Sequence, residues 1–307
     1  MMKSKTGSNK SVQSALLLVT AAAVWGFAFV AQRMGMEHVG PFTFNAVRFL
    51  LGALSLMPIY WLSTNRKGKK SHSLQNSTGI VKWGFFAGIA LFAGSSFQQI
   101  GLITTTAGNA GFITGLYVIF VPILGLFIKQ KTQPVVWLAA AMAVAGMYFL
   151  SVEEGWAINI GDMLVLISAL FFAIHVLVIG HLTKLYNALK LSIVQFLTCG
   201  VLSLVVALAI ENLSLDGITK AAIPILYGGL ISVGVGYTLQ VFGQKHSKPA
   251  PAAIILSTEA VFAVIGGVLI LHETMDIKSL FGCALMFAGM VLAQIKFPPL
   301  KSKKIAL

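Results

Sequence analysis

The chain alternates between long apolar runs and short polar or charged segments. About 20 apolar residues are enough for a helix to cross the hydrocarbon of a bilayer, and Pro, Gly and charged residues mark where each run ends. The pattern therefore predicts an all-α polytopic membrane protein. Its ten expected transmembrane helices cover residues 15–32, 42–62, 82–102, 110–128, 135–151, 161–180, 191–210, 221–242, 252–271 and 279–296.

Segments in the two halves of the chain match each other. Residues 252–273 fall on residues 111–132 at an offset of 141, and VRFL at 47–50 falls on VQFL at 194–197 at an offset of 147. Each half holds five spans, an odd number, so the second half enters the membrane from the opposite side. We expect two inverted five-helix repeats, 15–151 and 152–296, between tails at 1–14 and 297–307. An old duplication kept only for packing is the alternative.

Composition and charge agree with a membrane protein. Of the 307 residues, 57% are hydrophobic and only 10% are charged, where a soluble domain has roughly 25% charged residues. The net charge of +13 does not indicate nucleic acid, because the basic residues lie in loops and tails. With a cytoplasmic N-terminus, 18 of the 22 Lys and Arg residues fall inside. This bias predicts a cytoplasmic (inner) membrane protein with both termini in the cytoplasm.

Two ionisable residues stand out within the spans, where such groups are costly. Glu259 lies in the ninth span, and three roles are open for it: a structural hydrogen bond to a neighbouring helix, proton exchange with His175 as partner, or contact with a substrate amine. Arg48 lies in the second span, where it either anchors helix-end carbonyls near the interface or clamps a substrate carboxylate. His175 by itself is also consistent with a packed, satisfied histidine.

Polar and aromatic residues of the spans predict the wall of a cavity. By depth, Arg48, Gln98, Gln99 and Tyr117 belong to the outer side, and His175, Gln195, Gln240 and Glu259 to the inner side. Pro122 interrupts the fourth span, where it either frees the carbonyl of Val118 or only kinks the helix. We expect Glu259 and His175 to couple transport to protons. The expected substrate-binding residues are Trp25, Arg48, Gln99, Tyr117, Phe172, Gln195, Tyr237 and Gln240.

The motifs of several other chemistries are missing. There is no phosphate-cradling GxxxxGK[ST], no HExxH and no GxSxG. Cys199 and Cys283 lie in apolar runs without metal-ligand spacing. We therefore expect no enzyme activity, no cofactor and no metal.

Four segments carry a resemblance to a known family. WGFAFV (25–30), NAVRFLLGAL (45–54), GFITGLYVIFVPILGLFI (111–128) and STEAVFAVIGGVLILHE (257–273) resemble the two EamA repeats of the drug/metabolite transporter superfamily. The resemblance implies ten helices, a central cavity between the halves, and export of amino acids or other small metabolites. The chain departs from the family pattern at Ala260, where the family often has Pro. It also departs at His272, where a Gly precedes the family's Glu, and at Thr132, the first-half counterpart of Glu273.

Together these features predict a secondary transporter that exports small metabolites by alternating access, with proton coupling as one interpretation. The expected partners are a small-molecule substrate, protons and the lipid bilayer, with no nucleic acid, and the chain acts as a monomer or homodimer. The alternatives are a drug or toxic-compound exporter, a metabolite importer, and a non-transporting scaffold, sensor or intramembrane enzyme.

Overall fold

A computed structural model describes residues 3–66, 77–127, 134–151 and 159–292. All regular structure in these ranges is helical. The elements are α1 (Lys3–Met36), α2 (Pro41–Arg66), α3 (Ser77–Gly101), α4 (Ala107–Gly115), α5 (Tyr117–Phe127), α6 (Val135–Ser151), α7 (Ile160–Leu182), α8 (Ala188–Ile210), α9 (Leu215–Lys220), α10 (Ala222–Leu226), η2 (Tyr227–Tyr237), α11 (Thr238–Gln244), α12 (Pro249–Leu256), α13 (Glu259–Ile270) and α14 (Ile277–Leu292).

Eight helical spans within the described ranges are long and apolar enough to cross a membrane. Two shorter apolar helices, Trp137–Gly146 and Ile277–Gly289, overlap the fifth and tenth predicted spans. A helix suits a bilayer because it satisfies its own backbone hydrogen bonds where water is absent. Helix α1 begins at Lys3, inside the expected N-terminal tail. The expected C-terminal tail and Thr132 lie outside the described residues.

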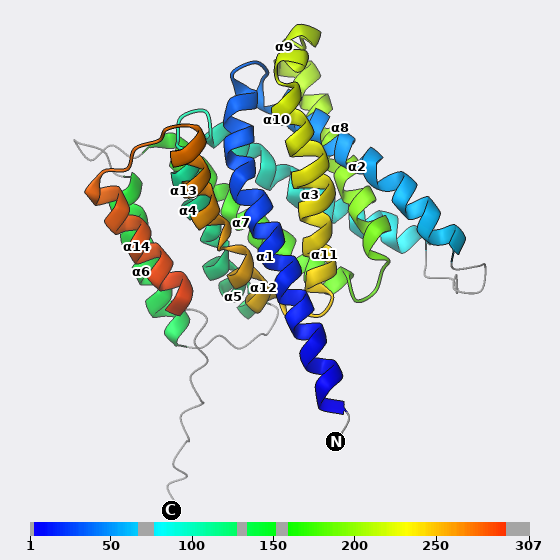
Figure 1. Cartoon of the computed structure of the whole chain (residues 1–307), viewed down its shortest axis with the longest axis horizontal. Coiled ribbons are helices and arrows are strands. Elements are labelled where there is room, and N and C mark those ends of the chain that lie inside the picture. Colours follow the sequence, from blue (N-terminus) through cyan, green and yellow to red (C-terminus); the bar gives the residue numbers. More distant parts are fainter. Residues whose placement is uncertain (1–2, 67–76, 128–133, 152–158, 293–307) are drawn as a thin grey trace, which may run out of the picture.

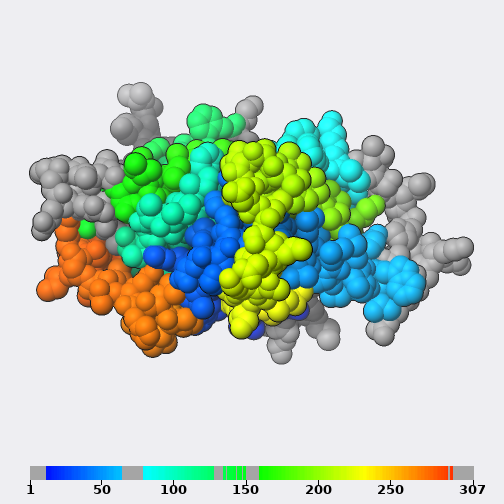
Figure 2. All heavy atoms as spheres, turned by 90° about the horizontal axis from the view of Figure 1, so that it is seen from above, coloured from blue at the N-terminus to red at the C-terminus, as the bar shows by residue number. Residues whose placement is uncertain are grey.

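The helices run side by side between two ends of the molecule (Figure 1). We call the end where α1 leads into α2 the upper end, as oriented in Figure 1; α1 begins and α14 ends at the lower end. Helices α6 and α14 pack together at one edge, and α2 packs on α8 at the other. From above, α1 lies between α13 and the yellow segment that includes η2 (Figure 2).

Glycines bring several helices into close contact. A Cβ atom at Gly84 or Gly88 of α3 would collide with Val194 or Thr198 of α8, and one at Gly111 of α4 would collide with Ala263 of α13. The spacing of Gly84 and Gly88 predicts such an approach. These contacts draw the spans around a common centre.

The fourth and ninth spans each lose the regular α-helical hydrogen-bond pattern for one or two residues near the middle of the span, which we call the break, although the backbone there stays in the right-handed helical region. The break in the fourth span is at Leu116, between α4 and α5, and the break in the ninth is at Ser257 and Thr258, between α12 and α13. Leu116 and Ser257 share the same backbone angles, φ −63° and ψ −12°. Pro122 is not the site of the break, because α5 stays helical through it. The eighth span changes to a π-helix over η2.

Candidate functional site

A cavity lies among the broken spans, and its empty space, including the part open to solvent, is about 470 Å³. Its wall combines aromatic and aliphatic side chains with amides, hydroxyls, an imidazole, a guanidinium and a carboxyl. Sixteen residues from α1, α2, α3, α4, α5, α7, η2, α11, α12 and α13 line it. They are Trp25, Ala28, Phe29, Gln32, Arg48, Gln98, Thr114, Tyr117, Phe172, His175, Val176, Ser232, Tyr237, Gln240, Leu256 and Glu259.

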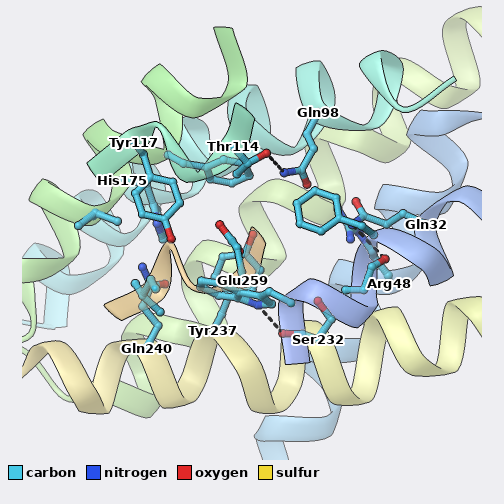
Figure 3. Close-up of a pocket in the computed structure, with 16 residues that line it drawn as sticks. Gln32, Arg48, Gln98, Thr114, Tyr117, His175, Ser232, Tyr237, Gln240 and Glu259 are labelled. Atoms are coloured by element: carbon cyan, nitrogen blue, oxygen red, sulfur yellow. Dashed lines mark hydrogen bonds between the residues drawn. The ribbon is translucent and has the colours of Figure 1, made fainter. Parts of the chain in front are cut away.

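The polar groups are spread along the cavity (Figure 3). Gln32, Arg48 and Gln98 gather at one end, and His175 and Gln240 at the other, with Glu259 between them. Gln98 donates to the Thr114 hydroxyl at 3.0 Å and so joins α3 to α4. The cavity therefore has a cationic end and a carboxyl near its middle.

Arg48 is only 3% exposed. Its Nε donates to Asn45 Oδ1 at 2.9 Å, and Asn45 in turn donates to the carbonyl of Ser95 at 3.1 Å. The guanidinium carbon lies 5.5 Å from the ring centre of Phe44 and 5.0 Å from that of Phe49, within the range of cation–π attraction. No acidic side chain of the described residues forms an ion pair with it. Arg48 is thus held in place, and none of the described residues gives it a counter-anion.

Glu259 begins α13 immediately after the break, and it is also 3% exposed. The Tyr117 hydroxyl is a near electrostatic neighbour of its carboxyl in the cavity. Even so, within the described part of the chain, neither that hydroxyl nor Glu259 Oε1 meets hydrogen-bond geometry with another group. The broken spans therefore bring a carboxyl and a phenol together, and each has unused hydrogen-bonding capacity.

His175 pairs with Gln195. Its Nε2 lies 2.8 Å from Gln195 Oε1, and its ring meets the ring of Tyr237 edge-on at 6.1 Å. The hydrogen-bond partner of His175 is therefore Gln195 rather than Glu259. The electrostatic neighbour of Glu259 is Tyr117.

The aromatic wall depends on the π-helix. The rings of Trp25 and Tyr237 lie 4.5 Å apart, and the Trp25 indole N–H donates to the carbonyl of Ser232 at 3.2 Å (Figure 3). A π-helix bonds each residue to the fifth one along, so Ser232 and Tyr237 lie close together on one side of the span. Gly236 leaves space for the Trp25 ring, since a Cβ there would press on the indole nitrogen.

Eight of the ten predicted site residues line this cavity: Trp25, Arg48, Tyr117, Phe172, His175, Tyr237, Gln240 and Glu259. Gln195 is behind the wall, bonded to His175. Gln99 is fully buried away from the cavity, and its neighbour Gln98 takes the lining position. Tyr117 lies toward His175 and Gln240 rather than beside Arg48, because it starts the lower half of the broken span.

Several lining residues were not predicted. Ala28, Phe29 and Gln32 follow Trp25 at helical spacings of three, four and seven, so the period of α1 could have identified them. Ser232 has no such signal, because its position depends on the π-helix. No sequence signal marks Thr114, Val176 and Leu256, because such residues are common throughout apolar spans.

The chemistry of the wall suits the binding of a small molecule. Within the described ranges, no group of three or more His, Cys, Asp or Glu residues could hold a metal ion. The wall offers a cation, a carboxyl, amides and aromatic faces, which together can hold a small molecule with charged and apolar parts.

Comparisons with known proteins agree on one class. A family model described as the EamA-like transporter family matches residues 13–152 and again residues 159–294. An uncharacterized transporter of Archaeoglobus fulgidus is 32% identical over 293 residues, which cover 94% of this chain and 87% of that protein. The uncharacterized transporter YoaV of Bacillus subtilis is 21% identical over 93% of this chain and 98% of its own length. One solved crystal structure shares the fold at a TM-score of 0.69 and 17% identity, covering 92% of this chain and 96% of the other.

Proposed function

Because the chain belongs to the EamA-like transporter family, we propose that it is a secondary transporter that exports amino acids or similar amphipathic metabolites by alternating access. Its proposed location is the cytoplasmic membrane, with both termini in the cytoplasm, as the excess of basic residues on one side of the spans indicates.

One observation supports the substrate class above all others. Arg48 and Glu259 are both buried at 3% exposure in the same cavity, and neither has an ion-pair partner among the described residues. An unpaired buried charge is unfavourable, and a bound partner removes that penalty. A ligand with a carboxylate and an ammonium group would supply both partners, since the guanidinium fork binds carboxylates well. The rings of Trp25 and Tyr237 would cover its apolar part.

The proposed architecture is ten helices in two inverted five-helix repeats, 15–151 and 152–296. In its support, the family model matches the chain twice, and the breaks at Leu116 and Ser257 are 141 residues apart, the same offset that aligns the repeat in the sequence. Interrupted helices near the middle of a span recur at the substrate sites of transporters with inverted repeats.

Proton coupling is proposed for Glu259. A carboxyl in a membrane cavity can take up a proton from one side and release it to the other as access alternates. The Tyr117 hydroxyl, which interacts with the carboxyl, is its proposed partner, and His175 with its bond to Gln195 is proposed to contact substrate.

The test is a substrate screen followed by transport. Amino acids, amines, sugars and common drugs are first screened for thermal stabilisation of the purified protein, because a ligand that binds the folded state raises its apparent stability. Hits are then assayed for exchange across proteoliposomes, alongside analogues that lack the carboxylate or the amine. We expect zwitterions to exchange and both kinds of analogue to exchange poorly.

Other results would point to the alternatives. Exchange of hydrophobic cations alone would indicate a drug exporter, and exchange of sugars would remove the proposed role of the charge pair. Binding without exchange of any ligand would indicate a non-transporting sensor or scaffold.

A further inference from the structure

The carboxylate of Glu273 holds the upper end of α4. Its Oε1 accepts from the backbone N–H of Ala107 at 2.7 Å, and its Oε2 accepts from that of Gly108 at 3.1 Å. These are the first two residues of α4, whose N–H groups have no partner within the helix. Glu273 follows α13, so its side chain connects the upper halves of the two broken spans.

A tight turn after α13 directs this side chain toward α4. His272 is the one non-glycine residue of the described chain with positive φ, at 54°, and the Glu273 N–H then donates back to the carbonyl of Gly267 at 3.0 Å. Gly267 is needed, because a Cβ there would collide with the Glu273 carboxylate. A residue in this unfavourable conformation persists only where its surroundings impose it, often at sites that switch.

Helices α1 and α7 are also connected to this contact between Glu273 and α4. Arg33 at the end of α1 lies 3.5 Å from Glu273 Oε1 and also donates to the carbonyl of Thr105 at 2.7 Å. The Thr105 hydroxyl in turn bonds Asp162 near the start of α7. Helices α1, α4, α7 and α13 are therefore joined at the upper end of the molecule.

All four helices supply walls of the cavity, including Thr114 from α4 and Glu259 from α13. Near the breaks, Gly111 of α4 packs closely on Ala260 and Ala263 of α13. We propose that Glu273 is a latch that holds the cavity closed at its upper end, and that opening to that side requires its carboxylate to release α4. This inference rests on the proposed alternating access.

In the sequence, the position that corresponds to Glu273 in the other half is uncharged. At the offset of 141 the equivalent of Glu273 is Thr132, which is neutral. A carboxylate cap of a helix N-terminus changes an equilibrium by about 2- to 30-fold. The latch therefore favours the conformation closed at the upper end over its mirror state by a factor in this range.

The test measures access to the cavity from each face of the membrane. Ala28 lines the cavity on α1, so Ala28→Cys provides a reporter thiol once Cys199 and Cys283 are replaced by alanine. The protein is reconstituted in liposomes without substrate, and the rate of labelling by a membrane-impermeant maleimide is measured from either face. Glu273→Gln, which keeps the shape but loses the charge and one acceptor, is compared with the parent.

Glu211→Gln is the matched control. The Glu211 carboxylate also accepts two helix N-terminal N–H groups at the upper end, those of Phe42 and Thr43 at 2.8 Å each, but it joins α8 to α2, which are unbroken and packed together. We expect Glu273→Gln to raise labelling from the upper face by about 2- to 30-fold, and Glu211→Gln to leave it unchanged although both lower thermal stability. If Glu273→Gln does not fold, Arg33→Gln replaces it, with a smaller increase expected.

The outcomes separate the latch from the proposed function. Equal labelling rates in the parent, Glu273→Gln and Glu211→Gln, with access from both faces, would overturn the latch alone. Labelling of the reporter thiol from one face only in every variant would show a fixed cleft and overturn alternating access itself.

Discussion

Replacing Arg48 by Met separates a substrate clamp from a structural anchor. Arg48 makes one charge-assisted hydrogen bond, worth about 2 kcal/mol, and two cation–π contacts, worth up to about 2 kcal/mol each where water is excluded. Against them stands the penalty of burying a cation with no counter-anion, effectively several kcal/mol. The two sides nearly cancel, so Met, which fills similar space and can contact both rings, should change the free energy of unfolding by no more than about 2 kcal/mol.

Binding should respond very differently from stability. A buried carboxylate partner of Arg48 is worth about 3–5 kcal/mol, which corresponds to a loss of about 10² to 4 × 10³-fold in affinity when the guanidinium is removed. The carboxamide of the same amino acid, which has no negative charge, should lose less than about tenfold. Arg48→Lys keeps the charge without the fork and should fall between wild type and Arg48→Met.

The assay combines thermal unfolding in detergent with titration of amino acids and their carboxamides. A variant that remains stable, binds the carboxamides and fails to bind the amino acids would support the clamp. A loss of more than about 3 kcal/mol in stability, with equal loss of both ligands, would show that Arg48 is an anchor and refute the reasoning.

Three further predictions concern the coupling group and the upper end. Glu259→Gln should abolish the pH dependence of exchange in proteoliposomes while the protein remains folded, and an unchanged pH profile would exclude Glu259 as the proton carrier. His272→Gly should leave the thermal midpoint unchanged or raise it, and His272→Val should lower it, because φ of 54° is costly for a β-branched side chain; equal midpoints would contradict the strained turn. Hydrogen bonds from Ser279, from its side chain and its backbone N–H, lower the pKa of Asp276, so the cap of α14 stabilises above about pH 4 and is lost as pH falls through the lowered pKa. Asp276→Asn should remove this step, worth a few tenths of a kcal/mol at an exposed site, from a plot of stability against pH.

Much of the architecture can be predicted from the sequence because a bilayer imposes simple rules. A span must be long and apolar, so eight of the predicted spans reappear with boundaries shifted by a few residues. An ionisable residue in such a span is expensive, so Arg48 and Glu259 stand out from the hydropathy pattern alone. The offset that places residue 116 on residue 257 is also readable from the sequence, although the break at both places is not.

The direction in which each side chain faces was decided by the tertiary structure. A soluble helix marks its buried face by amphipathicity, but a span surrounded by lipid is apolar on all sides and carries little of that signal. For this reason the sequence by itself could not place Gln98 rather than Gln99 on the cavity, or pair His175 with Gln195. The contact of Glu273 with α4 depends on the left-handed turn at His272, which joins residues 166 positions apart. Length and hydropathy thus determined which segments cross the membrane, and helix rotation, helix breaks and close glycine packing determined which of their side chains meet.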